Sequence, residues 1–114
     1  MPPKRNPMGL NPLQLKTLTL LQELARIAGQ PAGDEFPGGI AVTQLPQPHG
    51  DHFHLGESVV STRDATGLSN PSVWVALTRR GFIQPKPPDT IILMPLGQEY
   101  ETGLRDFILQ RAGH

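Results

Sequence analysis

The fold is decided by residues 66–83, which read TGLSNPSVWVALTRRGFI. Within this stretch, Asn70 followed by Pro71 predicts a helix start, because Asn caps a helix through its side-chain oxygen and Pro fits the first helical position. Apolar residues then recur at helical spacing until Gly81, which is typical of a helix stop. The stretch therefore predicts a helix over residues 71–80.

A two-stranded hairpin is predicted directly after this helix. Residues 81–84 and 90–94 flank a proline-rich loop at 85–89 and contain apolar β-formers, so we expect them to pair antiparallel. Phe82 and Ile83 are expected to hold this pair against the helices.

The same start signal occurs earlier in the chain, where Asn11 precedes Pro12. It predicts a helix over residues 11–28 that ends at Gly29. The leucines of this helix occupy more than one face, which indicates that the helix is either deeply buried or faces a second partner.

Between these two helices, residues 40–45 and 52–55 are expected to form a β-hairpin around a turn at 46–51. A short helix over 62–66 is expected next, capped by Ser61.

Gly67 is expected to end that short helix with a left-handed turn. A last helix is predicted over 97–111, from apolar residues at helical spacing. Residues 1–10 contain three prolines and two adjacent cations and predict a disordered arm, which leaves 11–111 as a single domain.

The composition excludes several classes of protein. Leu, Ile, Val and Phe account for 30 of the 114 residues, which is above the roughly 20% below which a chain usually cannot build a core. The absence of cysteine excludes a disulfide scaffold and a thiolate zinc site. No apolar run approaches the length of a membrane span, and the serines do not group with a base, so we expect a cytoplasmic protein that is not an enzyme and has no cofactor.

The order of the expected elements is that of a winged helix-turn-helix domain. Residues 66–69 resemble the turn between the two helices of that motif, 77–83 the exit from the recognition helix into the wing, and 93–97 the end of the wing. In these motifs the chain resembles MarR-like and related small bacterial transcriptional regulators. The resemblance implies an α+β winged helix-turn-helix fold, here with an extra β-hairpin after the first helix and a C-terminal helix, and it implies DNA binding.

If the protein binds double-stranded DNA, two groups of residues take part. Polar residues at the N-terminus of the recognition helix can reach base edges or phosphates, and cations contact phosphates. The expected DNA-binding residues are Arg63, Asn70, Ser72, Val75, Arg79, Arg80 and Lys86. The presence of Arg79 and Arg80 is also explained without DNA, since cations stabilise a helix C-terminus. Trp74 is expected in the core.

An alternative function is a winged-helix protein–protein interaction module that does not bind DNA. The net charge of zero, the short recognition helix and the proline-bound wing favour it, whereas the local cluster of cations favours DNA. We also expect a homodimer, because the helix at 11–28 and the stripe of Leu104, Phe107 and Ile108 present more apolar surface than so small a domain can cover.

One stretch carries residues of the kind that bind metals. His49, Asp51, His52 and His54 lie in or beside the turn of the expected hairpin, and two imidazoles with a carboxylate can hold zinc. Solvated side chains at a hairpin edge are the simpler interpretation, and we expect no metal site.

Overall fold

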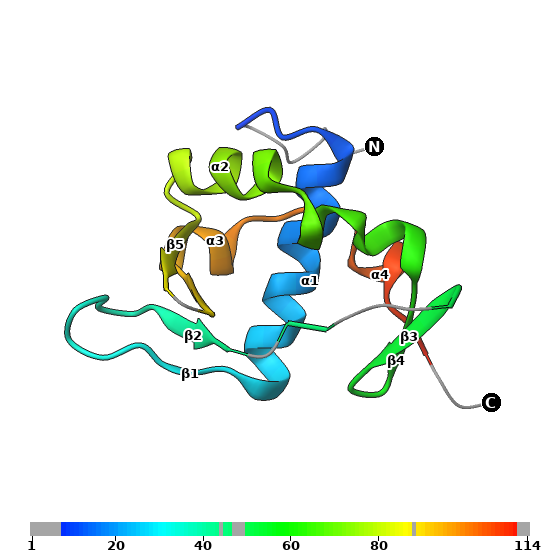
Figure 1. Ribbon diagram of the computed structural model, residues 1–114, viewed down its shortest axis with the longest axis horizontal. Coiled ribbons are helices and arrows are strands. Elements are labelled where there is room, and N and C mark those ends of the chain that lie inside the picture. Colours follow the sequence, from blue (N-terminus) through cyan, green and yellow to red (C-terminus); the bar gives the residue numbers. More distant parts are fainter. Residues whose placement is uncertain (1–7, 44, 47–49, 88, 112–114) are drawn as a thin grey trace.

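The computed structural model describes residues 8–43, 45–46, 50–87 and 89–111. Its longest helix, α1 (Pro12–Ala28), runs through the middle of the protein (Figure 1). The start of α1 is fixed by a capping box, in which the Asn11 side chain accepts a hydrogen bond from the Gln14 N–H (2.8 Å) and the Gln14 side chain accepts one from the Asn11 N–H (3.0 Å). The predicted helix at 11–28 is therefore confirmed.

Helix α1 is buried on most of its circumference by its own chain. Leu18, Leu20 and Leu21 point in different directions around the helix, and all three are fully buried. Helices, a 3-10 helix and sheet strands contact α1 along its length. Of the two explanations for its many leucines, deep burial within one chain is the one that the structure shows.

The larger sheet lies to one side of α1 in Figure 1 and contains the two strands predicted to pair after the second helix, a strand pair that we call the wing. Its four antiparallel strands, in spatial order, are β1 (Gln30–Pro31), β2 (Ile40–Val42), β6 (Thr90–Leu93) and β5 (Ile83–Lys86). The register pairs Ile83 with Leu93 and Lys86 with Thr90, so the pairing of the two wing strands is confirmed and extends into the expected loop.

The predicted hairpin between residues 40–45 and 52–55 is wrong. Strand β2 instead pairs with β6, with Ile40 opposite Leu93 and Val42 opposite Ile91. This pairing buries Val42 and sets the apolar residues of β2 against the apolar residues of β6, whereas residues 52–55 alternate polar and apolar side chains.

Residues 52–55 belong to a second, smaller sheet. Strand β3 (His52–Leu55) pairs with β4 (Ser58–Ser61), and β4 also pairs with β7 (Gln110–Arg111). Gly56, at φ +61°, starts the two-residue turn between β3 and β4. A Gly-X pair between two short apolar runs is a hairpin signal, and it outweighs the longer loop at 46–51.

A 3-10 helix, η1 (Thr62–Ser69), leads into α2 (Pro71–Arg79). The predicted helix at 71–80 is confirmed. The expected cap by Ser61 is wrong, since its side chain makes no capping hydrogen bond. Gly67 does not end the short helix in a left-handed turn either: η1 passes through Gly67, which is buried against α1.

The single helix predicted over 97–111 is wrong. The structure has two short helices, α3 (Pro95–Glu99) and α4 (Arg105–Ile108). The Gln22 side chain donates hydrogen bonds to the Gly97 and Tyr100 carbonyls, both at 2.8 Å, which satisfies acceptors that a longer helix would use. Gly103, at φ +74°, then turns the chain before α4 begins.

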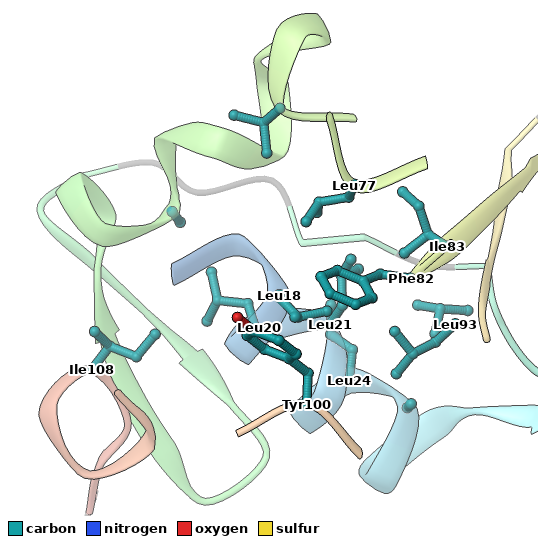
Figure 2. Packing of buried hydrophobic residues seen from close by; sticks show 14 of the residues in the cluster. Leu18, Leu20, Leu21, Leu24, Leu77, Phe82, Ile83, Leu93, Tyr100 and Ile108 are labelled. Atoms are coloured by element: carbon teal, nitrogen blue, oxygen red, sulfur yellow. The ribbon is translucent and has the colours of Figure 1, made fainter. Parts of the chain in front are cut away.

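The core joins α1, α2, the wing and the segment after α3, as Figure 2 shows. Phe82 is fully buried, and its ring centroid lies 4.8 Å from that of Tyr100. Leu77 reaches this cluster from α2, and Ile83 and Leu93 reach it from the wing. The expected role of Phe82 and Ile83, holding the wing against the helices, is confirmed, and the protein is a mixed α+β domain.

Two further expectations concern the chain ends and membranes. Residues 1–7 of the expected arm lie outside the described residues, while Leu10 is described and is buried in the core. No helix in the described part of the chain combines the length and the apolar character that crossing a bilayer requires.

Candidate nucleic-acid interface

Helix α2 is held to the core by one face and exposes the other. The Asn70 side chain caps its first turn, and Pro71 occupies the first helical position. Val73 and Leu77 are buried, whereas Ser72, Val75 and Arg79 are exposed. The helical period therefore brings three of the predicted DNA-binding residues to one solvent-facing stripe.

The connection between η1 and α2 is fixed by Trp74. Its indole Nε1–H donates a hydrogen bond to the Leu68 carbonyl at 3.0 Å, and the side chain packs against the core. Trp74 is half-buried, which agrees with the expected core role. Because this bond joins the end of η1 to the second turn of α2, the two helices form one unit, which we call the η1–α2 unit (Thr62–Arg79).

Asn70 and Ser72 are bonded to each other at the N-terminus of α2. The Asn70 Oδ1 accepts hydrogen bonds from the Ser72 N–H at 3.0 Å and from the Ser72 hydroxyl at 2.8 Å. The Asn70 amide oxygen is therefore committed to the helix cap. The structure assigns Asn70 a capping role, so a contact with a base that uses its amide oxygen has to share this oxygen, whereas its NH2 group makes no part of the cap.

The described lysine and arginine side chains fall into two groups according to their partners. Lys16 pairs with Asp64 at 2.9 Å, Lys86 pairs with Glu35 at 3.3 Å, and two arginines pair with Glu23. In the described part of the chain, no carboxylate lies within ion-pair distance of the remaining cations, Arg63, Arg79 and Arg80. All three belong to the η1–α2 unit or directly follow it.

Arg80 carries a second unusual feature. Its Nε atom is buried, and it has no hydrogen-bond partner among the described residues. A buried donor without a partner costs free energy, since it has lost its bond to water.

Lys86 does not join the free cations. Besides its ion pair with Glu35, its ammonium lies 5.7 Å from the centre of the Phe36 ring. The wing is thus tied to the loop between β1 and β2.

Arg63, the second residue of η1, and Arg79, the last residue of α2, lie at opposite ends of the η1–α2 unit.

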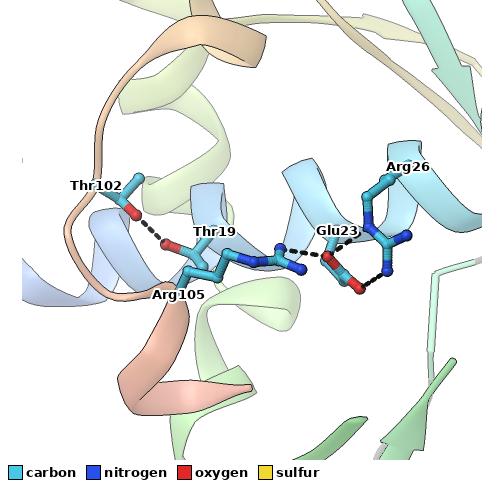
Figure 3. Close-up of polar contacts among 5 residues, drawn as sticks. All are labelled: Thr19, Glu23, Arg26, Thr102 and Arg105. Atoms are coloured by element: carbon cyan, nitrogen blue, oxygen red, sulfur yellow. Dashed lines mark hydrogen bonds and ion pairs between the residues drawn. The ribbon is translucent and has the colours of Figure 1, made fainter. Parts of the chain in front are cut away.

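A charged cluster that the sequence did not predict joins α1 to the C-terminal segment (Figure 3). Glu23 is only 1% exposed, and its carboxylate accepts hydrogen bonds from the guanidinium groups of Arg26 and Arg105. The bond from Arg26, helped by Arg105, holds the pKa of Glu23 below its usual range despite burial. Nearby, the hydroxyls of Thr19 and Thr102 are hydrogen-bonded at 2.6 Å.

This cluster attaches the C-terminal segment to the central helix. Arg26 is one helical turn from Glu23, and that spacing is a signal that the sequence does contain. Arg105 is 82 positions away, and no local pattern relates it to Glu23.

The metal candidates do not assemble into a site in the described part of the chain. His49 lies outside the described residues, and the others form no group of three or more ligands. The Asp51 carboxylate instead pairs with His52 Nδ1 at 2.8 Å, and this hydrogen bond lowers the pKa of Asp51. The rings of His52 and His54 meet edge to face with centroids 5.9 Å apart.

The candidate interface is therefore the outer face of the η1–α2 unit with the arginines at its two ends. Comparison of the chain with protein-family models, with curated proteins and with solved structures gives no significant match. The function has to be inferred from the residues themselves.

Proposed function

We propose that the protein is a winged-helix DNA-binding protein that regulates transcription, with α2 as its recognition helix. The order of elements supports this proposal: after α1 and four short strands, a 3-10 helix, a second helix and two paired strands follow one another, and these last three correspond to the helix-turn-helix and the wing. The wing strands β5 and β6 share one sheet with the strand that follows α1. Helix α2 projects beside this sheet with one face free (Figure 1).

The observation that carries the proposal is the placement of the free arginines. Arg63, Arg79 and Arg80 have no carboxylate partner in the part of the chain that the structure describes, while Lys16, Lys86, Arg26 and Arg105 each have one. No acidic residue occurs between Ala65 and Pro87. The one acidic residue of the η1–α2 unit, Asp64, is paired with Lys16. Cations without an acidic partner attract the phosphates of duplex DNA even when the net charge of the protein is zero.

The roles follow from chemistry. Arginines that contact phosphates position a protein on the duplex but carry no sequence information. An α-helix fits into the major groove, where base edges can be read. In this arrangement the arginines at the ends of the η1–α2 unit contact the phosphates of the DNA backbone, and the exposed stripe of Ser72 and Val75 faces the bases.

Charge removal at one matched pair of arginines tests the proposal. Arg79→Gln removes a free cation from the interface. The control, Arg26→Gln, removes another exposed arginine, in the last turn of α1, and leaves Arg105 paired with Glu23. We expect Arg79→Gln to weaken binding to random duplex DNA several-fold and to reduce the salt slope by about 0.9. Arg26→Gln should bind like the wild type in fluorescence anisotropy.

Equal weakening by both variants, or by neither, would contradict the proposed interface. Melting curves for each variant separate a loss of binding from a loss of folded protein.

A protein–protein interaction module remains the second candidate, and the wing favours it. Its lysine, Lys86, is engaged by Glu35 and Phe36 and therefore offers no free charge to a phosphate. This candidate predicts that folded protein binds no duplex DNA even at 50 mM salt, so the same titration distinguishes the two functions.

A further inference from the structure

The exposed stripe of α2 has an apolar residue at its centre. Ser72, Val75 and Arg79 follow one another at spacings of three and four residues, which places them on one helix face. Val75 is 49% exposed, although Val73 and Leu77, on the opposite face, complete the core. The isopropyl group of Val75 is thus presented to solvent between a hydroxyl and a free guanidinium.

The polar groups around Val75 are already hydrogen-bonded within the protein. The Ser72 hydroxyl donates to Asn70 Oδ1 at 2.8 Å, and the Thr78 hydroxyl donates to the Trp74 carbonyl at 2.7 Å. An Asn that recognises adenine uses its amide oxygen and nitrogen together, and the Asn70 oxygen is committed to the helix cap. The paired Asn–adenine contact would therefore compete with the helix cap, and the two hydroxyls have only their acceptor lone pairs left for a base.

The major groove offers one apolar feature, the C5-methyl group of thymine. We propose that α2 reads duplex DNA mainly by packing Val75 against a thymine methyl, with the arginines of the η1–α2 unit on the flanking phosphates. The inference rests on the proposed DNA-binding function and adds the base chemistry that the recognition helix prefers. Charge complementarity fixes the occupant, because the cations beside this apolar residue have no acidic partner among the described residues.

Exchange of thymine for uracil tests this contact directly, because it removes the methyl group and keeps the base pair. Duplexes that bind best are first selected from a random library, and the selected sequence is then remade with uracil at each thymine in turn. For the wild type, we expect uracil at the contacted position to weaken binding about fourfold, the effect of losing one buried methyl-sized group. Val75→Ala removes most of the apolar surface of this contact, so its preference for the thymine duplex should be clearly smaller than that of the wild type.

A control variant and a contradicting result complete the experiment. Ile27→Ala shortens another exposed aliphatic side chain, at the far end of α1, and should keep the wild-type preference for thymine. Ala favours a helix more than Val does, so Val75→Ala is expected to fold.

Three results would overturn the inference, the first two of them without touching the proposed function. Equal binding of thymine and uracil duplexes by the wild type, with the effect of Arg79→Gln intact, refutes the Val75 contact alone. A thymine preference that is as large in Val75→Ala as in the wild type does the same. Absence of any duplex binding at 50 mM salt refutes the proposed function together with the inference.

Discussion

Gly67 lies where η1 packs most closely on α1. A Cβ atom at this position would overlap the Thr17 hydroxyl, which itself donates a hydrogen bond to the Leu13 carbonyl at 2.9 Å. We predict that Gly67→Ala lowers the free energy of unfolding by about 1–3 kcal/mol, the usual cost of overpacking, in urea denaturation.

Adding Thr17→Ala should recover part of that loss, since it removes the overlapping oxygen. Unchanged stability of Gly67→Ala would show that the close approach of η1 and α1 is not as described.

Glu23 links the stability of the protein to pH. Its pKa is lowered in the folded protein, chiefly by the hydrogen bond from Arg26 and then by Arg105. The ion network therefore stabilises the fold fully above the unfolded pKa of about 4.3, and this stabilisation is lost as the pH falls through the lower folded pKa. We predict that Glu23→Gln lowers the free energy of unfolding by about 2 kcal/mol at neutral pH.

The variant should also lose less stability than the wild type when the pH falls from about 5 to about 3. Urea denaturation at both pH values measures this difference, with Glu99→Gln, which changes an exposed carboxylate on α3, as the control. Parallel losses in wild type and Glu23→Gln would rule out Glu23 as the source of the pH dependence.

For single residues, helical periodicity predicts which side chains of α2 face solvent. Ser72, Val75 and Arg79 are exposed where the spacing places them, because Val73 and Leu77 fix the inner face. The partners of charged residues are not predictable in the same way. The burial of Glu23 depends on Arg105, far along the chain, and the sequence shows only that both residues are charged.

Among the elements, the start of α2 depends on one side chain. Asn70 Oδ1 accepts the hydrogen bond from the Ser72 N–H that caps the helix. We predict that Asn70→Ala lowers the free energy of unfolding by about 1 kcal/mol, whereas Asn70→Asp, which keeps the capping oxygen, retains most of the stability.

The Asp variant adds a negative charge to the proposed DNA face and should therefore bind duplex DNA more weakly than the wild type. Thermal melts and anisotropy on the same samples separate the two effects. Normal stability of Asn70→Ala would contradict the capping role.

Elements with local signals are predicted well, and elements whose partners are distant are not. The Asn-Pro starts at Asn11 and Asn70 and the stop at Gly81 each act within a few residues, so α1, α2 and the pairing of β5 with β6 are confirmed. Strand β2 could pair with either of two apolar runs, and the choice of β6 depends on the packing of the whole sheet. The single helix predicted over 97–111 does not form, because the Gln22 side chain on α1 donates hydrogen bonds to the Gly97 and Tyr100 carbonyls.

For the whole molecule, the homodimer remains a proposal with one of its two reasons removed. Helix α1 is covered by its own chain and therefore no longer argues for a dimer. The remaining argument is the side chain of Phe107 on α4, which is 74% exposed. If two copies meet through this surface, sedimentation at micromolar concentration gives about twice the mass of a 12.4 kDa chain, and Phe107→Ser returns the single-chain mass. A wild-type mass of one chain would contradict the dimer.

The salt dependence of duplex binding tests the central proposal, a DNA interface made by the η1–α2 unit. Phosphate contacts by Arg63, Arg79 and Arg80 of one copy predict a log–log slope of about −2.7, and a dimer that uses about six such contacts predicts about −5. Affinity for random duplex DNA should then fall about 40-fold between 50 and 200 mM salt for one copy, and about a thousandfold for two. Folded protein that binds no duplex at 50 mM salt, or binds with a slope near zero, would contradict the proposed function.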